Sequence, residues 1–398
     1  MIGVSDYNGE GLDLKYAAKD AADISAALSN AAKKLLNTKD SNRVFMYNLI
    51  TGNNSNLQPL KINVIKVLEE IGKKATASDI LLFFFAGHGV ASGDAEKKQF
   101  YFLTAEASLK NPDASLEAVS ISTAELSEWI RPQIIKAQKR ILIFDACNSG
   151  QAINDFVNQG RDGQLLLKDA NNENAKQVKA IDKLNEKSGL FILAASAGNQ
   201  SAYEMSRYAQ GLLTYSLLKT IIEQPSVLDD GKYLNLSRWF NEAGKTVTET
   251  VRETGNRQDP QIVSNTNFNI GVVDDEVIAG IKLPIAKKLF AGCNFQNADE
   301  NIAADNLGLN KLTNQQLNEI SSRGDKAAIS YVAGSNAPDA FTLSGRYILA
   351  GNNISIKVFI RQKNEVKEKI DLTGTTEKLN ELATLVAAKA AEWVEKNK

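Results

Sequence analysis

The pattern of apolar and polar residues divides the first two thirds of the chain into short buried strands that alternate with amphipathic helices. Three apolar runs are typical of buried parallel strands and cover residues 79–86, 140–146 and 190–196. Apolar residues recur every three or four positions over 14–36, 60–71, 211–222 and 235–253, which predicts helices. Shorter strands are expected at 43–49 and 99–104, and the capping-box spacing of Ser122 and Glu125 predicts a helix toward Ala137.

This alternation predicts an α/β fold for residues 1–271, with a sheet of mostly parallel strands and helices on both faces. The pattern changes after about Gly271. Period-two alternation at Ile354, Ile356 and Val358 is typical of a half-buried antiparallel strand. With strands at 341–349 and 366–372 and helices at 313–320 and 377–395, it predicts a smaller α+β domain over residues 272–398.

Composition excludes several classes of protein. The 46 basic and 47 acidic residues give a formal net charge of -1, which argues against a broadly basic nucleic-acid binder. The longest apolar runs are far shorter than the ~18 residues that a membrane-spanning helix needs. Two cysteines, Cys147 and Cys293, make no disulfide framework, and with a single histidine, His88, they leave almost no scope for a zinc site.

The start of the chain shows no signal peptide, because Met1 is followed at once by a short strand and its exit turn. A strand that begins one residue before its own turn suggests either a segment of a longer protein or a very short strand. We therefore leave the localisation open and favour the cytoplasm.

The residues that can carry chemistry follow two of the predicted strands. His88 stands in Gly87-His88-Gly89 after the strand 79–86, and Cys147 follows the strand 140–146. Open α/β sheets bind ligands at the carboxyl ends of their strands. A single histidine or cysteine is more often structural, but together an imidazole can take the proton of the thiol during nucleophilic attack. The backbone N–H groups of Gly89 and Cys147 could stabilise the developing oxyanion.

The chain resembles the caspase-like cysteine peptidases, and more closely their metacaspase and bacterial branch. Phe84-Phe85-Ala86-Gly87-His88-Gly89 is similar to the histidine motif of that family, and Asp145-Ala146-Cys147-Asn148-Ser149-Gly150 to its nucleophile motif. Further similar segments lie, in the right order, at residues 2–7, 19–21, 195–197, 211–215 and 258–261. The resemblance covers about residues 1–270 and implies a caspase-like fold, a Cys147–His88 dyad and protein or peptide substrates.

One departure from animal caspases bears on specificity, because Asp145 stands where those enzymes have Gln. In the metacaspase branch an acid at this place and one on the first helix line a pocket for a basic side chain. The resemblance therefore implies that Asp145 and Asp20 bind Arg or Lys of the substrate. Ser196 is a further candidate substrate-binding residue, and Tyr203 and Glu204 could line the same cleft. A solvated helix face remains the alternative for Asp20, and ordinary loop positions for the other three.

Residues 151–188 form a long polar stretch that follows the nucleophile strand, and connections of this length are usually functional or disordered. They offer basic residues to an enzyme with an acidic pocket, so we expect self-cleavage here, at Arg161, Lys168, Lys176, Lys179, Lys183 or Lys187. Simple solvation of the loop is the alternative.

Two other functions remain open. In a caspase-like scaffold for recruitment or sensing, hydrolysis would be lost or incidental, whereas the intact His88 and Cys147 favour an enzyme. A nucleotide-binding domain is disfavoured because no glycine-rich phosphate motif follows a strand. We expect no cofactor and no metal site; some metacaspases need calcium, and nothing in the sequence decides this for the present chain. The C-terminal domain could bind a partner, and Cys293 is interpreted as structural.

Overall fold

The computed structural model describes residues 1–398 except 10, 37–42, 53–56, 94–97, 109–115, 154–188, 199, 253–255, 264–266, 300, 301, 303, 324, 325, 334–336, 338, 364 and 398. The chain forms two compact units. The first comprises Met1–Glu204, Gln210–Glu249 and Arg257–Leu283, and the second comprises Met205–Ala209, Thr250–Asn256 and Pro284–Lys398. The boundary near residue 271 that the sequence suggests stays a prediction.

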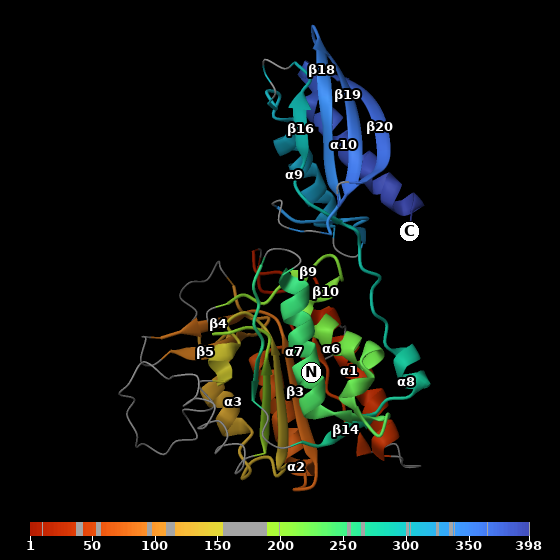
Figure 1. The fold of residues 1–398 in the computed structure, drawn as a ribbon. Coiled ribbons are helices and arrows are strands. Elements are labelled where there is room, and N and C mark those ends of the chain that lie inside the picture. Colours follow the sequence, from red (N-terminus) through yellow and green to blue (C-terminus); the bar gives the residue numbers. More distant parts are fainter. Residues whose placement is uncertain are drawn as a thin grey trace, which may run out of the picture. The chain divides into compact units, whose positions relative to one another are not determined.

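The first unit is built on a six-stranded, mainly parallel sheet, as expected (Figure 1). Its strand order is β13-β8-β7-β3-β1-β2, and only β13 runs antiparallel to its neighbour. The strands are β1 (Ile2–Gly3), β2 (Leu49–Ile50), β3 (Ile80–Ala86), β7 (Lys139–Asp145), β8 (Leu190–Ala194) and β13 (Gln261–Val263).

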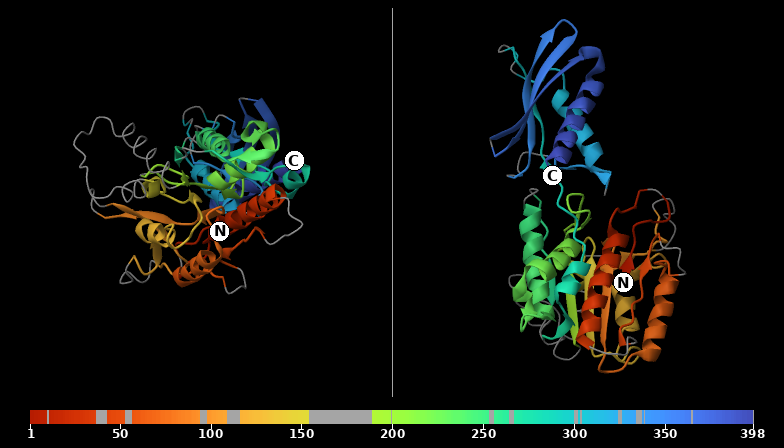
Figure 2. Two further views of the ribbon diagram at one scale, coloured as in Figure 1. Left: turned by 90° about the horizontal axis from the view of Figure 1, so that it is seen from below. Right: turned by 90° about the vertical axis from the view of Figure 1, so that its right-hand side faces the viewer.

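The sheet lies between two layers of helices (Figure 2). Alternate residues of its strands face one layer or the other. Phe83 and Phe85 of β3 join the core that also holds buried residues of α2 and α3, whereas Phe84 is buried on the opposite face of the sheet. On that other side α1 packs against α6, and Trp239 of α7 donates a hydrogen bond to the Leu217 carbonyl of α6. The helices are α1 (Ala17–Leu36), α2 (Lys61–Lys74), α3 (Thr123–Trp129), α6 (Leu212–Glu223), α7 (Leu236–Arg252) and α8 (Asp275–Gly280).

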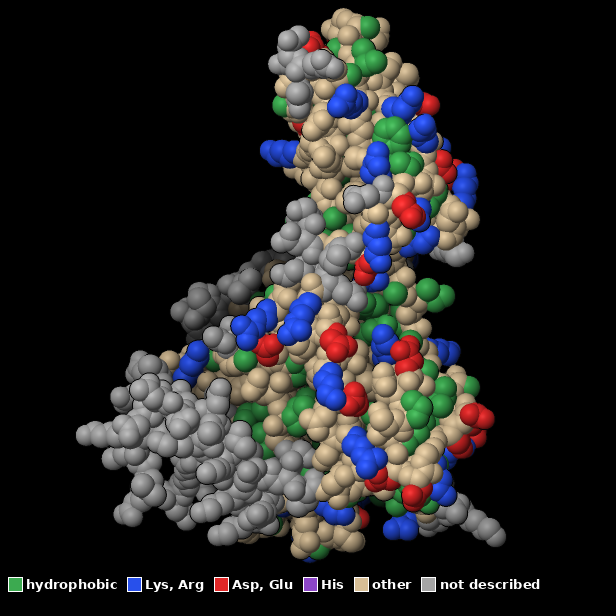
Figure 3. Space-filling model, in the orientation of Figure 1, with side chains coloured by type: hydrophobic (Ala, Val, Ile, Leu, Met, Phe, Trp, Pro, Cys, Tyr) green, Lys and Arg blue, Asp and Glu red, His purple; other side chains and the backbone are tan. Residues whose placement is uncertain are grey.

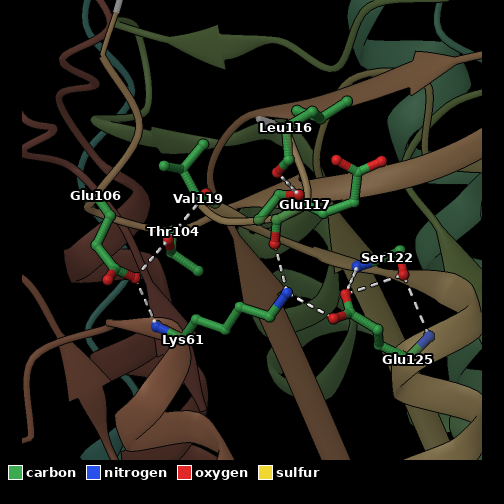
Figure 4. A network of polar contacts seen from close by, with 9 residues as sticks. Lys61, Thr104, Glu106, Leu116, Glu117, Val119, Ser122 and Glu125 are labelled. Atoms are coloured by element: carbon green, nitrogen blue, oxygen red, sulfur yellow. Dashed lines mark hydrogen bonds and ion pairs between the residues drawn. The ribbon is translucent and has the colours of Figure 1, made fainter. Parts of the chain in front are cut away.

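Helix α3 begins with the predicted capping box. The Ser122 hydroxyl accepts from the Glu125 N–H, and the Glu125 carboxylate accepts from the Ser122 N–H. Lys61 of α2 forms an ion pair with the same carboxylate and so ties two helices together (Figure 4). The expected continuation to Ala137 is wrong, since α3 ends at Trp129. Pro132 follows three residues later, and a proline disfavours the helical conformation of the residue before it.

Short strands complete the first unit. Two three-stranded sheets and one two-stranded sheet lie outside the main sheet. The expected strand over 43–49 is also wrong, because only β2 at its far end pairs with β1. The additional strands are β4 (Gly89–Ser92), β5 (Gln99–Leu103), β6 (Ser120–Ser122), β9 (Glu204–Met205), β10 (Gln210–Gly211), β11 (Leu228–Asp229), β12 (Tyr233–Asn235) and β14 (Asn269–Val272); a 3-10 turn covers Pro225–Val227.

The second unit is α+β. Its four-stranded sheet has the order β16-β18-β19-β20, and the predicted period-two alternation places Ile354, Ile356 and Val358 on the buried face. Residues of two helices cover that face. The elements are β15 (Leu289–Phe290), β16 (Asn294–Asn297), α9 (Leu309–Ser321), β17 (Ser330–Tyr331), β18 (Thr342–Ala350), β19 (Asn353–Gln362), β20 (Glu365–Thr375), a 3-10 turn (Thr376–Lys378) and α10 (Leu379–Lys396).

The described surface carries both signs of charge. Figure 3 shows basic and acidic side chains interspersed on the visible face of the first unit, in keeping with the net charge of -1. None of the helices in the described part of the chain is both long and apolar enough to span a membrane.

Candidate active site

His88 and Cys147 stand at equivalent places on neighbouring strands. Strands β3 and β7 pair in parallel with Ala86 opposite Asp145, so each candidate residue lies two positions beyond a paired strand end. The Gly87 N–H donates to the Asp145 carbonyl at 3.3 Å, which continues the contact past the ladder. The sheet thus brings residues 59 positions apart in sequence to the same edge.

The imidazole of His88 is fixed from two sides. Its Nε2 lies 2.7 Å from the Leu12 carbonyl oxygen. A carbonyl only accepts hydrogen bonds, so Nε2 carries the proton and Nδ1 is the free base of the neutral ring. The His88 backbone N–H donates to the Tyr7 hydroxyl at 2.8 Å, and the two rings pack with their centroids 5.2 Å apart.

The segment that provides the Leu12 carbonyl and the Tyr7 hydroxyl is itself held by hydrogen bonds. The Tyr7 N–H donates to Asp13 Oδ1 at 3.0 Å, and the Leu14 N–H donates to the Ser5 carbonyl at 2.8 Å. Burial raises the pKa of Tyr7, so its hydroxyl stays protonated at physiological pH. The role of Leu12 was not foreseen from the sequence, since a backbone carbonyl leaves no signal in residue type.

The sulfur of Cys147 contacts one residue on the connection after β8. The Ala202 N–H donates to Sγ at 3.4 Å, and the thiol lies 3.6 Å from the Ala202 carbonyl oxygen, which can accept its proton. The next residue, Asn148, has φ of 56°, in the left-handed region that non-glycine residues rarely adopt. Its N–H donates to the Gln200 carbonyl at 3.0 Å. Cys147 therefore lies on a sharp turn that the backbone of residues 200–202 supports.

Only glycine fits at position 89. A Cβ there would lie 2.5 Å from the Cys147 carbonyl oxygen and 2.5 Å from the Phe100 ring. Opposite Gly89 on β5 is Phe102, and the Leu103 N–H donates to the His88 carbonyl. This pattern marks Gly89 and Phe102 as a non-hydrogen-bonded pair, so the Gly89 N–H points away from β5. Its close approach to Cys147 places a backbone donor beside this candidate nucleophile.

Asp145 and Asp20 lie together and are buried. Gly211 separates them: a Cβ on that glycine would lie 2.7 Å from Asp145 Oδ2 and 2.8 Å from Asp20 Oδ2. Asp145 accepts from the Thr214 N–H at 3.1 Å and the Thr214 hydroxyl at 2.7 Å, and Asp20 accepts from the Gly211 N–H at 2.9 Å. Helix α1, the end of β7 and the start of α6 thus meet in one acidic cluster.

The environment of the cluster raises the pKa of both acids. Burial raises the pKa of Asp145 to about 6, partly offset by the Thr214 hydrogen bonds. Burial also raises the pKa of Asp20, and the neighbouring charge of Asp145 raises it further. The Oδ1 atom of Asp20 and the Oε1 atom of Gln210 are buried with no hydrogen-bond partner among the described residues. Two acceptors of this kind need donors from elsewhere.

The comparison with known families agrees with this geometry. The family model described as a caspase domain, a peptidase family, matches residues 1–269. The chain belongs to the caspase-domain family. No curated protein matches it significantly. Among solved structures it is similar to protein GSU0716 from Geobacter sulfurreducens, at 14% identity and a TM-score of 0.38, over 70% of this chain and 94% of that one. The membership assigns the chain to the cysteine peptidases, whose substrates are proteins or peptides.

The remaining candidates of the caspase domain lie around the connection after β8. Ser196 is fully buried and its hydroxyl donates to the Gln200 carbonyl at 3.0 Å. Its substrate-binding role stays a prediction, and this placement would let it act only by shaping the connection. Glu204 accepts from the Lys15 and Tyr16 N–H groups at the start of α1. The Tyr203 N–H donates to Gln258 Oε1.

Three further expectations concern other parts of the chain. Residues 154–188, which hold the predicted self-cleavage positions, lie outside the described residues. Within the described ranges, no cluster of three or more His, Cys, Asp or Glu side chains is arranged to hold a metal ion; a calcium requirement is not tested by this. Burial raises the pKa of Cys293 to about 12, so this thiol forms little thiolate.

Proposed function

We propose that this caspase-domain protein is an endopeptidase that cleaves after Arg or Lys, with Cys147 as nucleophile and His88 as general base. The observation that carries the proposal is the pair of buried carboxylates, Asp20 and Asp145, on either side of Gly211. Buried acids need compensation by a cation or by protonation. Within the described part of the chain no ion pair involves either acid. A substrate Arg or Lys side chain would supply the missing charge and the missing donors.

The chemistry follows from the tautomer of His88. Its Nδ1 takes the proton of the Cys147 thiol while the sulfur attacks the carbonyl carbon of the substrate. The resulting oxyanion would accept from the Gly89 and Cys147 N–H groups. Collapse of this intermediate breaks the C–N bond, and the imidazolium gives its proton to the leaving amine. Water, deprotonated by His88, then hydrolyses the thioester, which releases the new carboxyl group and restores the thiol.

The cluster of Asp20 and Asp145 should reject a substrate with an acidic residue before the cut. A substrate Asp would meet the like charges of Asp20 and Asp145, typically at a cost of several kcal/mol. Animal caspases, which cut after Asp and hold the substrate carboxylate with arginines, have Gln at this place, whereas this chain has the acid Asp145. The proposed preference for Arg or Lys before the cut is therefore opposite in charge to the preference of animal caspases for Asp.

The dyad is tested by two substitutions. Cys147→Ala and His88→Ala should each abolish hydrolysis of an Arg peptide, while circular dichroism and Tm show that the fold is retained. Ser237→Ala, on the surface start of α7, serves as a control that keeps wild-type turnover. Near-wild-type turnover by either dyad variant would disprove the proposed roles.

We also propose that the enzyme cleaves itself between residues 151 and 188. The support is the sequence alone: six basic residues in a long polar connection directly after the nucleophile. Incubating the wild type beside Cys147→Ala and sequencing the new amino termini tests this. We expect cuts after Arg or Lys in the wild type only. No cut in this range, under conditions where an Arg peptide is cleaved, would refute self-processing.

A further inference from the structure

In the described part of the connection after β8, the contacts with Cys147 and Asn148 come from backbone groups. The Ala202 N–H donates to Cys147 Sγ, and the Gln200 carbonyl accepts from the Asn148 N–H. These two contacts lie on either side of the bond between residues 147 and 148. Since no side chain of the connection touches the sulfur in these contacts, its position depends on how firmly the 200–203 backbone is fixed.

A buried glutamine near the end of the caspase-domain sequence, Gln258, contacts that backbone directly. Gln258 is fully buried, and its side-chain amide makes two hydrogen bonds. Nε2 donates to the Ala195 carbonyl at 2.9 Å, and Oε1 accepts from the Tyr203 N–H at 3.1 Å. The amide thus bridges the end of β8 and the residue directly after Ala202.

A second pair of contacts supports the same segment. The Gln200 side chain donates from Nε2 to Asp259 Oδ2 at 2.8 Å, and its Oε1 accepts from the Asp259 N–H at 2.9 Å. Two adjacent residues, 258 and 259, therefore hold both ends of the 200–203 segment. Residues that lie 55 and 59 positions after Tyr203 and Gln200 are thereby coupled to Cys147.

We propose that Gln258 is a positioning residue for Cys147. The inference rests on the proposed function in one respect, namely that Cys147 is the nucleophile. By fixing the Tyr203 N–H, Gln258 keeps the Ala202 N–H directed at the sulfur. An N–H donor that is already oriented stabilises the thiolate as it forms, because no reorganisation is then needed. The contribution of Gln258 is therefore to thiol reactivity and not to recognition of the substrate side chain.

The experiment measures the alkylation rate of Cys147 by iodoacetamide at pH 7, with mass spectrometry to separate this thiol from Cys293. Gln258→Met keeps the volume of the side chain but removes both hydrogen bonds. We expect its alkylation rate to fall about five- to tenfold, the usual effect of one lost oriented hydrogen bond. Turnover number for an Arg peptide should fall similarly, with KM changed less than about twofold.

Two further variants keep the test decisive. Gln261→Ala is the matched control, because Gln261 is exposed and its side chain donates to the neighbouring Asp259 and Pro260 carbonyls. Its alkylation rate should equal that of the wild type. Gln200→Ala removes the second pair of contacts and should lower the rate in the same direction, which decides the matter if Gln258→Met does not fold.

The inference would be overturned if Cys147 of a folded Gln258→Met variant is alkylated at the wild-type rate. If Gln258→Met does not fold, the same result with a folded Gln200→Ala variant would overturn it. Because alkylation needs no peptide substrate, this result is distinct from failure of the proposed specificity. A protein that cleaves no Arg peptide but shows the loss of alkylation would refute the proposed function and retain the positioning role.

Discussion

Asp145 and Asp20 occupy an environment that opposes their charge. Burial raises the pKa of Asp145 from 3.8 to about 6, and burial together with the charge of Asp145 raises the pKa of Asp20. An acid with a raised pKa in the folded state binds more protons when folded than when unfolded. Folding stability therefore falls as pH rises through this range. The pair destabilises the free protein at neutral pH, where it is best able to bind a cation.

Replacing Asp145 with Asn should consequently stabilise the protein while impairing its activity. The amide can still accept from the Thr214 donors but carries no charge. We expect thermal unfolding at pH 8 to show a gain of about 1–3 kcal/mol over the wild type. The gain should shrink at pH 5, where Asp145 is already largely protonated. Asp371→Asn, at an exposed position of the second unit, is the control and should change stability little at either pH.

A lower stability of Asp145→Asn than of the wild type at pH 8 would show that the carboxylate is favourably solvated in the free protein. The same titration predicts how activity depends on pH. The KM for an Arg peptide should rise as pH falls below about 6, because protonation of Asp145 removes the charge that attracts the cation.

Tyr7 is predicted to orient His88 through its hydroxyl. Tyr7→Phe removes the acceptor of the His88 N–H and leaves the ring packing. We expect kcat for an Arg peptide to fall about tenfold with KM nearly unchanged, since only alignment of the base is affected. Tyr47→Phe is the control, as that hydroxyl contacts only surface groups. A higher KM for the Arg peptide without a loss of kcat would contradict this role.

At the level of single residues, the sequence indicated the candidate catalytic and substrate-binding side chains but not the backbone groups that contact them. His88, Cys147 and the two acids could be found because rare or charged side chains stood in recognisable motifs. The Leu12 carbonyl and the Ala202 N–H could not, because any residue type supplies those groups. The burial of Asp20 was also uncertain from its position on an amphipathic helix, where an acid is normally solvated.

Gly211, the residue before α6, lies between the two carboxylates of the acidic cluster. Gly211 precedes this helix with φ of -61°, which an alanine can adopt. Gly211→Ala leaves the backbone unstrained, but its methyl group would lie 2.7 Å from Asp145 Oδ2 and 2.8 Å from Asp20 Oδ2, so both carboxylates must shift. We expect kcat/KM for an Arg peptide to fall by about a hundredfold or more. Alkylation of Cys147 should stay near the wild-type rate.

Gly244→Ala, in the middle of α7 with ordinary contact distances, is the matched glycine control and should leave hydrolysis unchanged. Equal turnover by Gly211→Ala and the wild type would mean that the substrate side chain does not enter between Asp20 and Asp145.

Elements with strong patterns were predicted well, and short ones were not. The apolar runs of β3, β7 and β8 and the capping box of α3 were recognisable because each meets a local rule. Strands β4 and β6 have four and three residues, too few for a periodic signal. The Gly89 end of β4 is moreover set by the approach of Cys147 from a distant strand, a tertiary effect that no local pattern carries.

At the level of the whole molecule, the first unit should function without the second. Its core lies within one compact unit that extends to Leu283. Lys34 of α1 forms ion pairs with Asp274 and Glu276, and Val277 of α8 is buried. A fragment of residues 1–283 keeps these contacts, whereas a fragment of residues 1–271 loses them.

We expect both fragments to cleave an Arg peptide if they fold, because domains with their own cores usually fold alone. The 1–283 fragment should have the higher Tm. Complete loss of activity in a well-folded 1–283 fragment would mean that the second unit completes the site.

The most direct test of the central claim compares three fluorogenic peptides that differ only in the residue before the cut: Arg, its neutral isostere citrulline, and Asp. Citrulline keeps the shape of the Arg side chain and removes its charge, so the comparison isolates the attraction to Asp20 and Asp145. The account predicts a kcat/KM for Arg at least about a hundredfold above that for citrulline, and no measurable cleavage after Asp. Equal cleavage after Arg and citrulline, or efficient cleavage after Asp, would contradict it.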